Sequence, residues 1–400
     1  MAIRECALKD PAFRALKHAN DHRDEAARAF RAAGGKVIGE LGWDVPDEFV
    51  IGAGMMPLRI WADPGKPTAQ TDRYLEYSFD PVVRAQFEQL IDGTAAGLTD
   101  ALAVSNSTDV LIRAYLYLRE IRRTEPECRV PDLEFIDWLF TREMIYQKRN
   151  EFVAGLFRNA VDRWAGRTVA DDEIRTGALI CNRSRAALRR IAALRRGAEV
   201  RVNGSEALVI IGSAFFMDRA EHAELVERLA EAAASWPVIS APRIYFTGSA
   251  PQDTDLYDLI EAQGLVIVGE DHDWGDRFYE RDFDITLDPV KAAVDRYMLR
   301  EFSSKKAFVS QRVEALDREA ADSGAGGVIF FMNEYEESAS WDYPSQNESL
   351  RAKGIKTACF AKMKWPVDKN EGLGERLAAF AAEMKERPSA SAADTEGGVN

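Results

Sequence analysis

The amino-acid sequence predicts an α/β fold in which two Rossmann-like parallel-sheet domains face a cleft and are joined by a long-helix segment. Strand-like and helix-like segments alternate near both ends of the chain, long amphipathic helices fill the middle, and the two outer parts form a weak internal repeat. A chain of 400 residues, 46% of them hydrophobic, is long enough for two or three domains.

Changes of pattern divide the chain into five predicted segments. They are an N-terminal helical segment at 1–35, a first α/β domain at 36–141, a helical segment at 142–237, a second α/β domain at 238–386 and a disordered tail at 387–400. Gly34 and Gly35 are typical of a helix end, and the tail is small and polar, so it has too little apolar surface to fold.

The first α/β domain alternates strands and helices along its whole length. The predicted strands are KVIGELGW, PLRIWAD, ALAVSN and DLEFIDWLF, and the predicted helices are DEFVIGAG, PVVRAQFEQLIDG and TDVLIRAYLYLREIRR. Pro46 and Pro81 stand at the starts of the first two helices, where proline is tolerated. The last helix carries apolar residues every three or four positions.

The middle of the chain is helical, and the α/β pattern then returns. The predicted long helices are YQKRNEFVAGLFRNAVDRWAG, DDEIRTGALICNRSRAALRRIAALRRG and DRAEHAELVERLAEAAASW. In the second α/β domain the predicted strands are PRIYFTGS, LVIVGED, GGVIFFMN and IKTACFAKMK, and the predicted helices are DTDLYDLIEAQG, SQNESLRAKG and ERLAAFAAEMKER. A strand–helix–strand unit requires a right-handed crossover and a parallel sheet.

Setting the two α/β domains side by side reveals the repeat. VIGELGWDVPDEFVIGAGMMPLRIW matches IYFTGSAPQDTDLYDLIEAQGLVIV as strand, proline turn, helix, glycine and strand. ALAVSNSTD likewise matches VIFFMNEYEES as a strand followed by a polar loop. Ligands of open parallel sheets bind at the carboxyl ends of the strands, so these polar loops and GEDHDWGDR are predicted to line the cleft.

Composition argues against nucleic-acid and membrane partners. The 66 acidic and 52 basic residues give a net charge of −14, which repels a phosphate backbone. The one dense basic stretch, at 183–197, has the helical spacing of a solvated helix face. There is no apolar run of the ~18 residues that a membrane span needs, and the N-terminus lacks a secretory signal.

The four cysteines indicate a reducing compartment. Cys6, Cys128, Cys181 and Cys359 are scattered and form no Cys-x-x-Cys pair. This is typical of free thiols, not of a disulfide framework or a zinc site. We therefore expect a cytoplasmic protein, with Cys181 and Cys359 in the core.

Motifs for nucleotide binding and for a nucleophile elbow are absent from the sequence. One histidine pair could be either a metal site or part of a solvent-exposed helix face. No Gly-x-Gly-x-x-Gly follows a strand, and neither a P-loop nor a Gly-x-Ser-x-Gly motif is present. His18 and His22 are four apart on a predicted helix and have the spacing for a shared metal. Without a carboxylate or cysteine partner, we expect them to face solvent instead.

The loop GEDHDWGDR at 269–277 holds the strongest candidates for a site. It crowds acids, a histidine, a tryptophan and an arginine just past a buried strand, and such a group is typical of a pocket wall. Glu270 and His272 are the catalytic candidates, because His272 can transfer a proton near neutral pH. Trp274 and Arg277 are candidates for binding substrate.

The segment GAGMMPLRI at 52–60 supplies two further candidates for substrate binding, Met55 and Arg59. On sequence alone this is a tight connection with core methionines. The cationic side chain of Arg59 could also meet an anionic ligand.

Several of these segments together resemble the subunits of the 2-hydroxyacyl-CoA dehydratase and benzoyl-CoA reductase family, from about residue 36 to about residue 385. The resemblance rests on VIGELGWDVPDEFVIGAGMMPLRI, RVNGSEALVIIGSAFF, RIYFTGS with GEDHDWGDR, WDYPSQNESLRAKGI and GERLAAFAAEM. It implies a cytoplasmic acyl-CoA enzyme built from two homologous subunits. An ATP-dependent activator protein would supply an electron that reduces the thioester to a ketyl radical anion.

The resemblance also implies a [4Fe–4S] cluster on cysteines at three loops. The positions here that match those cysteines are Asp80 before Pro-x-x-Arg, Thr108 before Asp109, and Glu336 ahead of the Tyr-Pro helix. Iron–sulfur clusters are held by thiolates, and none of the three is a cysteine. We therefore expect the cluster in a homologous partner subunit, while two carboxylates and a hydroxyl could instead suit a Mg²⁺-like ion or simply fill the loops.

Two further functions fit the same sequence features. The chain could be a cluster-free paralogue with a structural or regulatory role, or it could use the cleft for another small ligand. Neither the acyl group nor the stoichiometry follows from the sequence.

Overall fold

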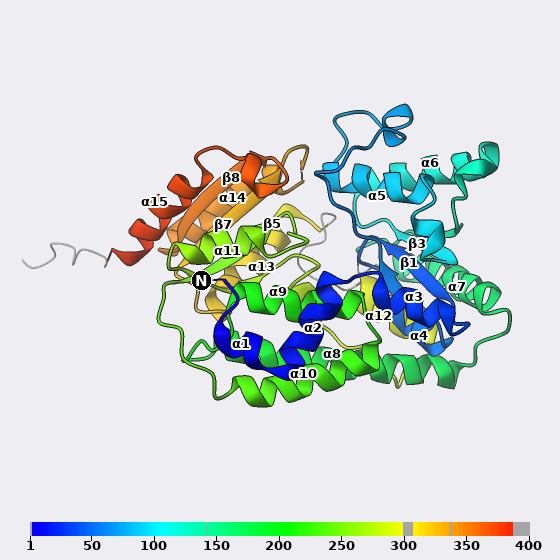
Figure 1. Ribbon diagram of the computed structural model, residues 1–400, viewed down its shortest axis with the longest axis horizontal. Helices are drawn as coiled ribbons and strands as arrows, with labels where there is room; N and C mark the ends of the chain where they lie inside the picture. Colours follow the sequence, from blue (N-terminus) through cyan, green and yellow to red (C-terminus); the bar gives the residue numbers. More distant parts are fainter. Residues whose placement is uncertain (1, 142, 299–306, 337, 387–400) are drawn as a thin grey trace, which may run out of the picture.

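Two parallel four-stranded β-sheets, one in each half of the chain, form the framework of the protein (Figure 1). The computed structural model describes residues 2–141, 143–298, 307–336 and 338–386. The tail predicted to be disordered at 387–400 lies outside them. The first sheet has the order β2-β1-β3-β4, with β1 Val37–Leu41, β2 Met56–Arg59, β3 Ala101–Ser105 and β4 Asp132–Ile136. The second has the order β6-β5-β7-β8, with β5 Arg243–Gly248, β6 Val266–Glu270, β7 Gly327–Asn333 and β8 Lys356–Met363.

The strand order is the same in both sheets when their strands are taken in chain order, so the weak sequence repeat corresponds to a repeated structural unit. All pairings are parallel. In each sheet the chain leaves the first strand to one side and later returns on the other. The resulting switch points, between β1 and β3 and between β5 and β7, are where ligands of such sheets bind. The predicted α/β class with two Rossmann-like units is confirmed.

A glycine ends the first strand of each unit in the same way. Gly42 follows β1 with φ +96°, and Gly248 ends β5 with φ +117°. A Cβ on Gly42 would lie 2.3 Å from the Ser105 hydroxyl, and one on Gly248 would lie 2.1 Å from the Phe331 carbonyl oxygen. Only glycine fits both the left-handed conformation and the close approach of the neighbouring strand.

The helices of the described residues fall into four groups. The N-terminal group is α1 Glu5–Lys9, α2 Pro11–Asp21 and α3 Glu25–Ala32, and the first unit contains α4 Asp47–Gly52, α5 Pro81–Ile91 and α6 Asp109–Thr124. The central group is α7 Met144–Ala165, α8 Asp171–Arg196, α9 Gly204–Gly212 and α10 Arg219–Ala233. The second unit contains α11 Asp255–Ala262, α13 Val309–Asp322, α14 Ser338–Ala352 and α15 Leu373–Lys385. Helix α12 Pro289–Met298 lies between α11 and α13 in the chain but packs against α7, in the apolar cluster of the first unit.

Helix α8 runs beneath both units and connects them through buried ion pairs (Figure 1). Near its middle, Arg185 pairs with Glu48 of α4 at 2.5 Å, and near its end Arg195 pairs with Glu270 of β6 at 2.5 Å. All four side chains are at most 2% exposed. The basic stretch that was interpreted as a solvated helix face is therefore only partly solvated, because these two of its arginines point inward.

The two faces of each sheet pack into different apolar clusters, because successive side chains of a strand alternate between the faces. In the second sheet, Ile244, Phe246 and Ile329 pack against the central helices, while Tyr245 and Phe330 pack on the opposite face.

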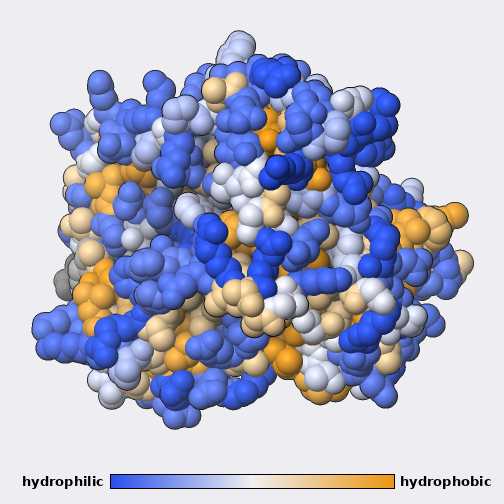
Figure 2. Space-filling model, turned by 45° about the vertical axis from the view of Figure 1, so that its right-hand side comes forward, coloured by the Kyte–Doolittle hydropathy of each residue, from blue (hydrophilic) through white to orange (hydrophobic). Residues whose placement is uncertain are grey.

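Figure 2 shows a mainly hydrophilic exterior with separate hydrophobic patches, in keeping with the acidic composition. Among the described residues, no helix is both long enough and apolar enough to span a membrane.

One predicted helix differs from the structure in its start, and helices α9, α12 and α13 were not predicted. Helix α14 begins at Ser338 and contains Pro344, whereas the sequence predicted a helix that starts after this proline. Helix α9 was not predicted, because all nine of its residues are buried and it has no polar face to reveal a helical period. Of the two cysteines expected in the core, Cys181 is buried and Cys359 is partly exposed; all four cysteines are free.

Candidate ligand-binding cleft

A cavity of about 250 Å³ lies at the carboxyl ends of both sheets, between the two units. Its walls come from the loops after β1, β2 and β3 of the first unit and after β5, β6 and β7 of the second. Both glycine turns, at Gly42 and Gly248, line it. The predicted cleft therefore exists at the two switch points, and the three polar loops of the sequence converge on it.

Most of the candidate site residues line this one cavity. They are Arg59, Asp80, Thr108, His272, Trp274, Arg277 and Glu336. Two candidates, Glu270 and Met55, lie outside the lining of the cavity.

Glu270 forms part of the scaffold behind the cavity. Its two carboxylate oxygens accept from Arg195 Nη1 and Nη2 at 2.7 and 2.5 Å, and its side chain is 2% exposed. A carboxylate held in a bidentate, buried pair does not face a ligand. Met55 is also buried, in the apolar cluster that contains Val50 and Ala53, as its alternative interpretation as a core methionine predicted.

The three positions that match the family's cluster cysteines all line the cavity, but their side-chain oxygens accept hydrogen bonds from nearby backbone N–H groups. The Asp80 carboxylate accepts from the backbone N–H groups of Val82 and Val83 at 2.8 and 3.1 Å, and so caps α5. The Thr108 hydroxyl accepts from Leu111 N–H at 3.3 Å and caps α6. Glu336 Oε1 accepts from Ser338 N–H at 3.1 Å.

This donor set does not fit a conventional iron–sulfur cluster. Hard carboxylate and hydroxyl oxygens replace the soft thiolates that such clusters need, and no cysteine lines the cavity. Within the part of the chain that the structure describes, no group of three or more His, Cys, Asp or Glu residues in this cavity brings its ligand atoms within 4.8 Å of one another.

Four arginines line the cavity, and two of them, Arg59 and Arg277, are buried. Arg59 donates to Asp273 at 2.6 Å and lies 4.3 Å from the Phe215 ring, so a carboxylate already faces it. Arg277 lies 5.3 Å from the Trp43 ring and is only 4% exposed. A desolvated guanidinium is a strong partner for an anionic or carbonyl oxygen.

His272 reaches the cavity as a neutral imidazole. Burial lowers the pKa of His272 to about 4. Its Nε2 bonds with the Tyr257 hydroxyl at 2.8 Å, and among the described residues its buried Nδ1 has no hydrogen-bond partner. The hydrogen bond with Tyr257 thus fixes the orientation of the ring.

The structure adds Asp271, a residue that the sequence interpretation did not select. Burial raises the pKa of Asp271 to about 7, although the Thr247 hydroxyl, which donates to it at 2.8 Å, and Arg277 act in the opposite direction. Asp271 lines the cavity beside His272. Asp271 is the first residue after β6, whereas Glu270 is the last residue of the strand and turns toward α8. An exact prediction of where the strand ends could therefore have distinguished Asp271 from Glu270 as the residue that faces the cavity.

These features define a two-unit Rossmann-like protein with a cavity lined by polar and charged side chains where the two sheets meet. The chain belongs to the family described as 2-hydroxyglutaryl-CoA dehydratase, D-component, which matches residues 42–384. The resemblance inferred from the sequence motifs is thereby confirmed.

Curated relatives match most of the chain at low identity. The beta subunit of (R)-2-hydroxyglutaryl-CoA dehydratase from Acidaminococcus fermentans is 24% identical over 338 residues, which is 82% of this chain and 86% of that protein. The (R)-phenyllactyl-CoA dehydratase beta subunit of Clostridium sporogenes is 21% identical over 80% of this chain and 85% of that protein. Lactoyl-CoA dehydratase subunit beta of Anaerotignum propionicum is 20% identical over 93% of this chain and 96% of that protein.

Proposed function

We propose that this chain is the beta-type subunit of a heteromeric 2-hydroxyacyl-CoA dehydratase and that its cleft receives the acyl thioester. The observation that carries the proposal is the position of the cavity. It lies at both switch points, and all of its lining residues fall within the 42–384 region that the family shares. The names of the three relatives supply the substrate class, a 2-hydroxyacyl-CoA.

The proposed roles follow from charge and protonation. Arg277 would bind the thioester carbonyl or a nearby anionic group, and Arg59, restrained by Asp273, would shape the wall beside it. Elimination of water requires a group that takes a proton from carbon and a group that gives a proton to the departing hydroxyl. Asp271 can do either near neutral pH, and His272, which stays neutral there, would hydrogen-bond the substrate without changing its charge.

The size of the cavity agrees with an acyl group but not with a whole coenzyme A. A volume of about 250 Å³ is slightly below the roughly 300–1,000 Å³ typical of pockets for drug-sized ligands. We therefore propose that the acyl end occupies the cavity and that the nucleotide end extends outside it.

We further propose that any iron–sulfur cluster of the complex is held by a homologous, cysteine-bearing partner subunit. The support is the donor set of Asp80, Thr108 and Glu336, two members of which already cap helices. The ATP-dependent activator implied by the family resemblance would then act on that partner. We also propose that the protein is located in the cytoplasm.

The test measures thioester binding by the purified chain, alone and with its partner, by isothermal titration calorimetry with lactoyl-CoA and with free coenzyme A. The Arg277→Ala variant should bind lactoyl-CoA at least tenfold more weakly. The matched control is Arg281→Ala, four residues along the same loop, whose side chain is 41% exposed and pairs with Asp295 outside the cavity. Equal affinities of wild type and R277A would remove Arg277 from the site.

A second function, that of a cluster-free structural or regulatory paralogue, is favoured by the same missing thiolates. The two functions differ in what the wild-type chain binds. If it assembles with a cysteine-bearing homologue but shows no affinity for any acyl-CoA, the structural role is supported. Iron and acid-labile sulfide in the anaerobically purified chain alone would contradict placing the cluster in the partner.

A further inference from the structure

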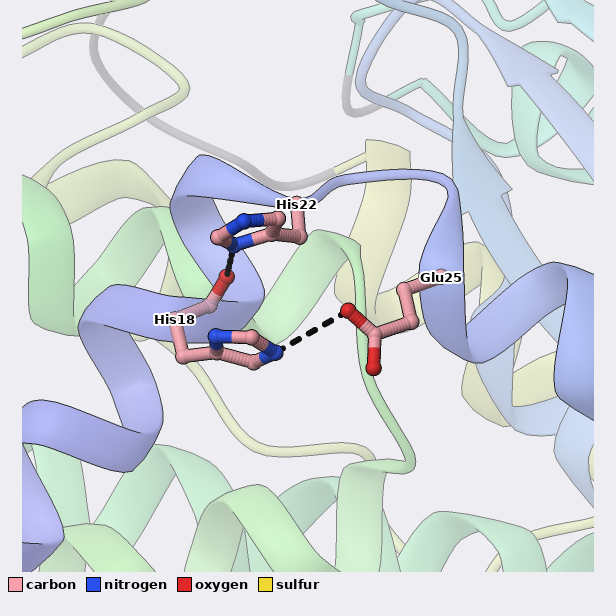
Figure 3. Close-up of side chains that lie close together, drawn as sticks. All are labelled: His18, His22 and Glu25. Atoms are coloured by element: carbon pink, nitrogen blue, oxygen red, sulfur yellow. Dashed lines mark hydrogen bonds and ion pairs between the residues drawn. The ribbon is translucent and has the colours of Figure 1, made fainter.

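We infer that His18, His22 and Glu25 form a binding site for a divalent transition metal such as Zn²⁺, outside the cleft. One ligand atom from each side chain lies within 4.8 Å of the other two, and this is the only such group among the described residues (Figure 3). Sequence spacing alone assigned no carboxylate to the histidine pair. The structure supplies Glu25, which begins α3 after the turn that follows α2.

The geometry of the three side chains suits a metal ion. His18 Nε2 and Glu25 Oε2 lie 3.0 Å apart, and the two imidazole rings are stacked with centroids 4.2 Å apart (Figure 3). Two ligands of a tetrahedral ion with bonds of about 2.1 Å are separated by roughly 3.4 Å. All three residues are exposed, so small rotamer changes can bring the atoms to that separation, and water can complete the coordination.

The local electrostatics also favour a cation. His18 lies in the last turn of α2, and His22 is the residue that ends this helix, so both stand at its negative end. A metal would take the place of the hydrogen that His18 and Glu25 share. Imidazole nitrogen with carboxylate oxygen is a ligand set typical of zinc and of neighbouring transition metals.

Such an ion would hold the turn between α2 and α3 in place, and this turn contacts residues that line the cleft. Arg23, next to His22, places its guanidinium 4.8 Å from the Trp61 ring and 5.1 Å from the ring of Trp274, a residue of the cavity wall. Arg23 also donates to the backbone carbonyl of Gln252, another lining residue. We therefore expect metal binding to stabilise the N-terminal helices against the cleft; this inference does not depend on the proposed acyl-CoA activity.

The experiment titrates the chelator-treated, full-length chain with Zn²⁺ by isothermal titration calorimetry and measures its melting temperature with and without Zn²⁺. Wild type should bind one ion per chain and melt at a higher temperature with it. His18→Ala and His22→Ala should each weaken binding at least tenfold and abolish the increase in melting temperature. Glu25→Gln should also weaken it, since an amide is a poorer ligand than a carboxylate.

Two variants serve as matched controls. Glu5→Gln removes an exposed carboxylate from α1, and Cys6→Ser removes a partly exposed thiol that could also bind zinc. Both should bind Zn²⁺ as wild type does. The inference is overturned if wild type binds no zinc at 100-fold excess, if His18→Ala and His22→Ala bind it as tightly as wild type, or if only Cys6→Ser loses binding. Because all three proposed ligands are exposed, circular dichroism should show these variants folded.

Discussion

Arg195 donates two parallel hydrogen bonds to Glu270 from the last turn of α8 to the end of β6, and both side chains are at most 2% exposed. This pair fixes the strand end from which the loop 271–277 enters the cleft. Removing one partner leaves the other charge buried and unpaired, at a cost of roughly 3–5 kcal/mol.

The first prediction concerns this pair. Arg195→Ala should lower the free energy of unfolding by about 3–5 kcal/mol, measured by urea denaturation followed by circular dichroism. The control is Arg190→Ala on the same helix, whose 48% exposed side chain lies 3.6 Å from Glu231. It should cost less than about 1 kcal/mol. Similar effects of the two variants would mean that the Arg195–Glu270 pair is not buried as described.

The second prediction uses Asp271. Its pKa is raised to about 7 in the folded state, so between pH 4 and 7 the folded protein binds more protons than the unfolded chain does. This group therefore stabilises the fold at low pH, and the contribution is lost as pH rises through 7. Asp271→Asn should be more stable than wild type at pH 8 by at most about 4 kcal/mol, and the difference should shrink toward pH 4. A pH-independent difference would contradict it.

The third prediction concerns His272, whose contribution to stability changes with pH in the opposite direction to that of Asp271. Burial lowers the pKa of His272 to about 4, so the unfolded chain binds the additional proton between pH 6.5 and 4. Its contribution to stability is present above pH 6.5 and is lost as pH falls toward 4. His272→Gln should therefore lose less stability than wild type when acidified over that range. Denaturant titrations at several pH values would measure this, and a steeper loss than in wild type would contradict it.

The fourth prediction concerns the glycine turn at the end of β5. Gly248→Ala should destabilise the protein by about 2 kcal/mol or more, because its Cβ would lie 2.1 Å from the Phe331 carbonyl and its φ is +117°. The control is Gly155→Ala inside α7, where a Cβ meets nothing within 4 Å. It should instead stabilise by roughly 0.5–1 kcal/mol. Melting curves of both variants would test the contrast.

Much of the fold could be predicted from sequence, since it is recorded in local patterns. Continuous apolar runs marked the buried parallel strands, and proline and glycine marked where the helices begin and end. The repeat led to two units of the same topology, and hence to a cleft at their switch points. Helix α9 escaped because a helix buried on every side has no amphipathic period.

The site was predictable only in outline. The loop 269–277 pointed to the cleft, but one residue of difference at the strand end decided that Asp271 faces the cavity while Glu270 meets Arg195, which lies 75 residues earlier in the chain. Local spacing likewise placed His18 and His22 together, whereas the turn after α2 decided that Glu25 joins them. Backbone conformation depends mainly on residues that are neighbours in the sequence, so the sequence by itself predicted most helices and strands. Side-chain direction, burial and charge compensation depend on distant segments, so only the tertiary structure determined them.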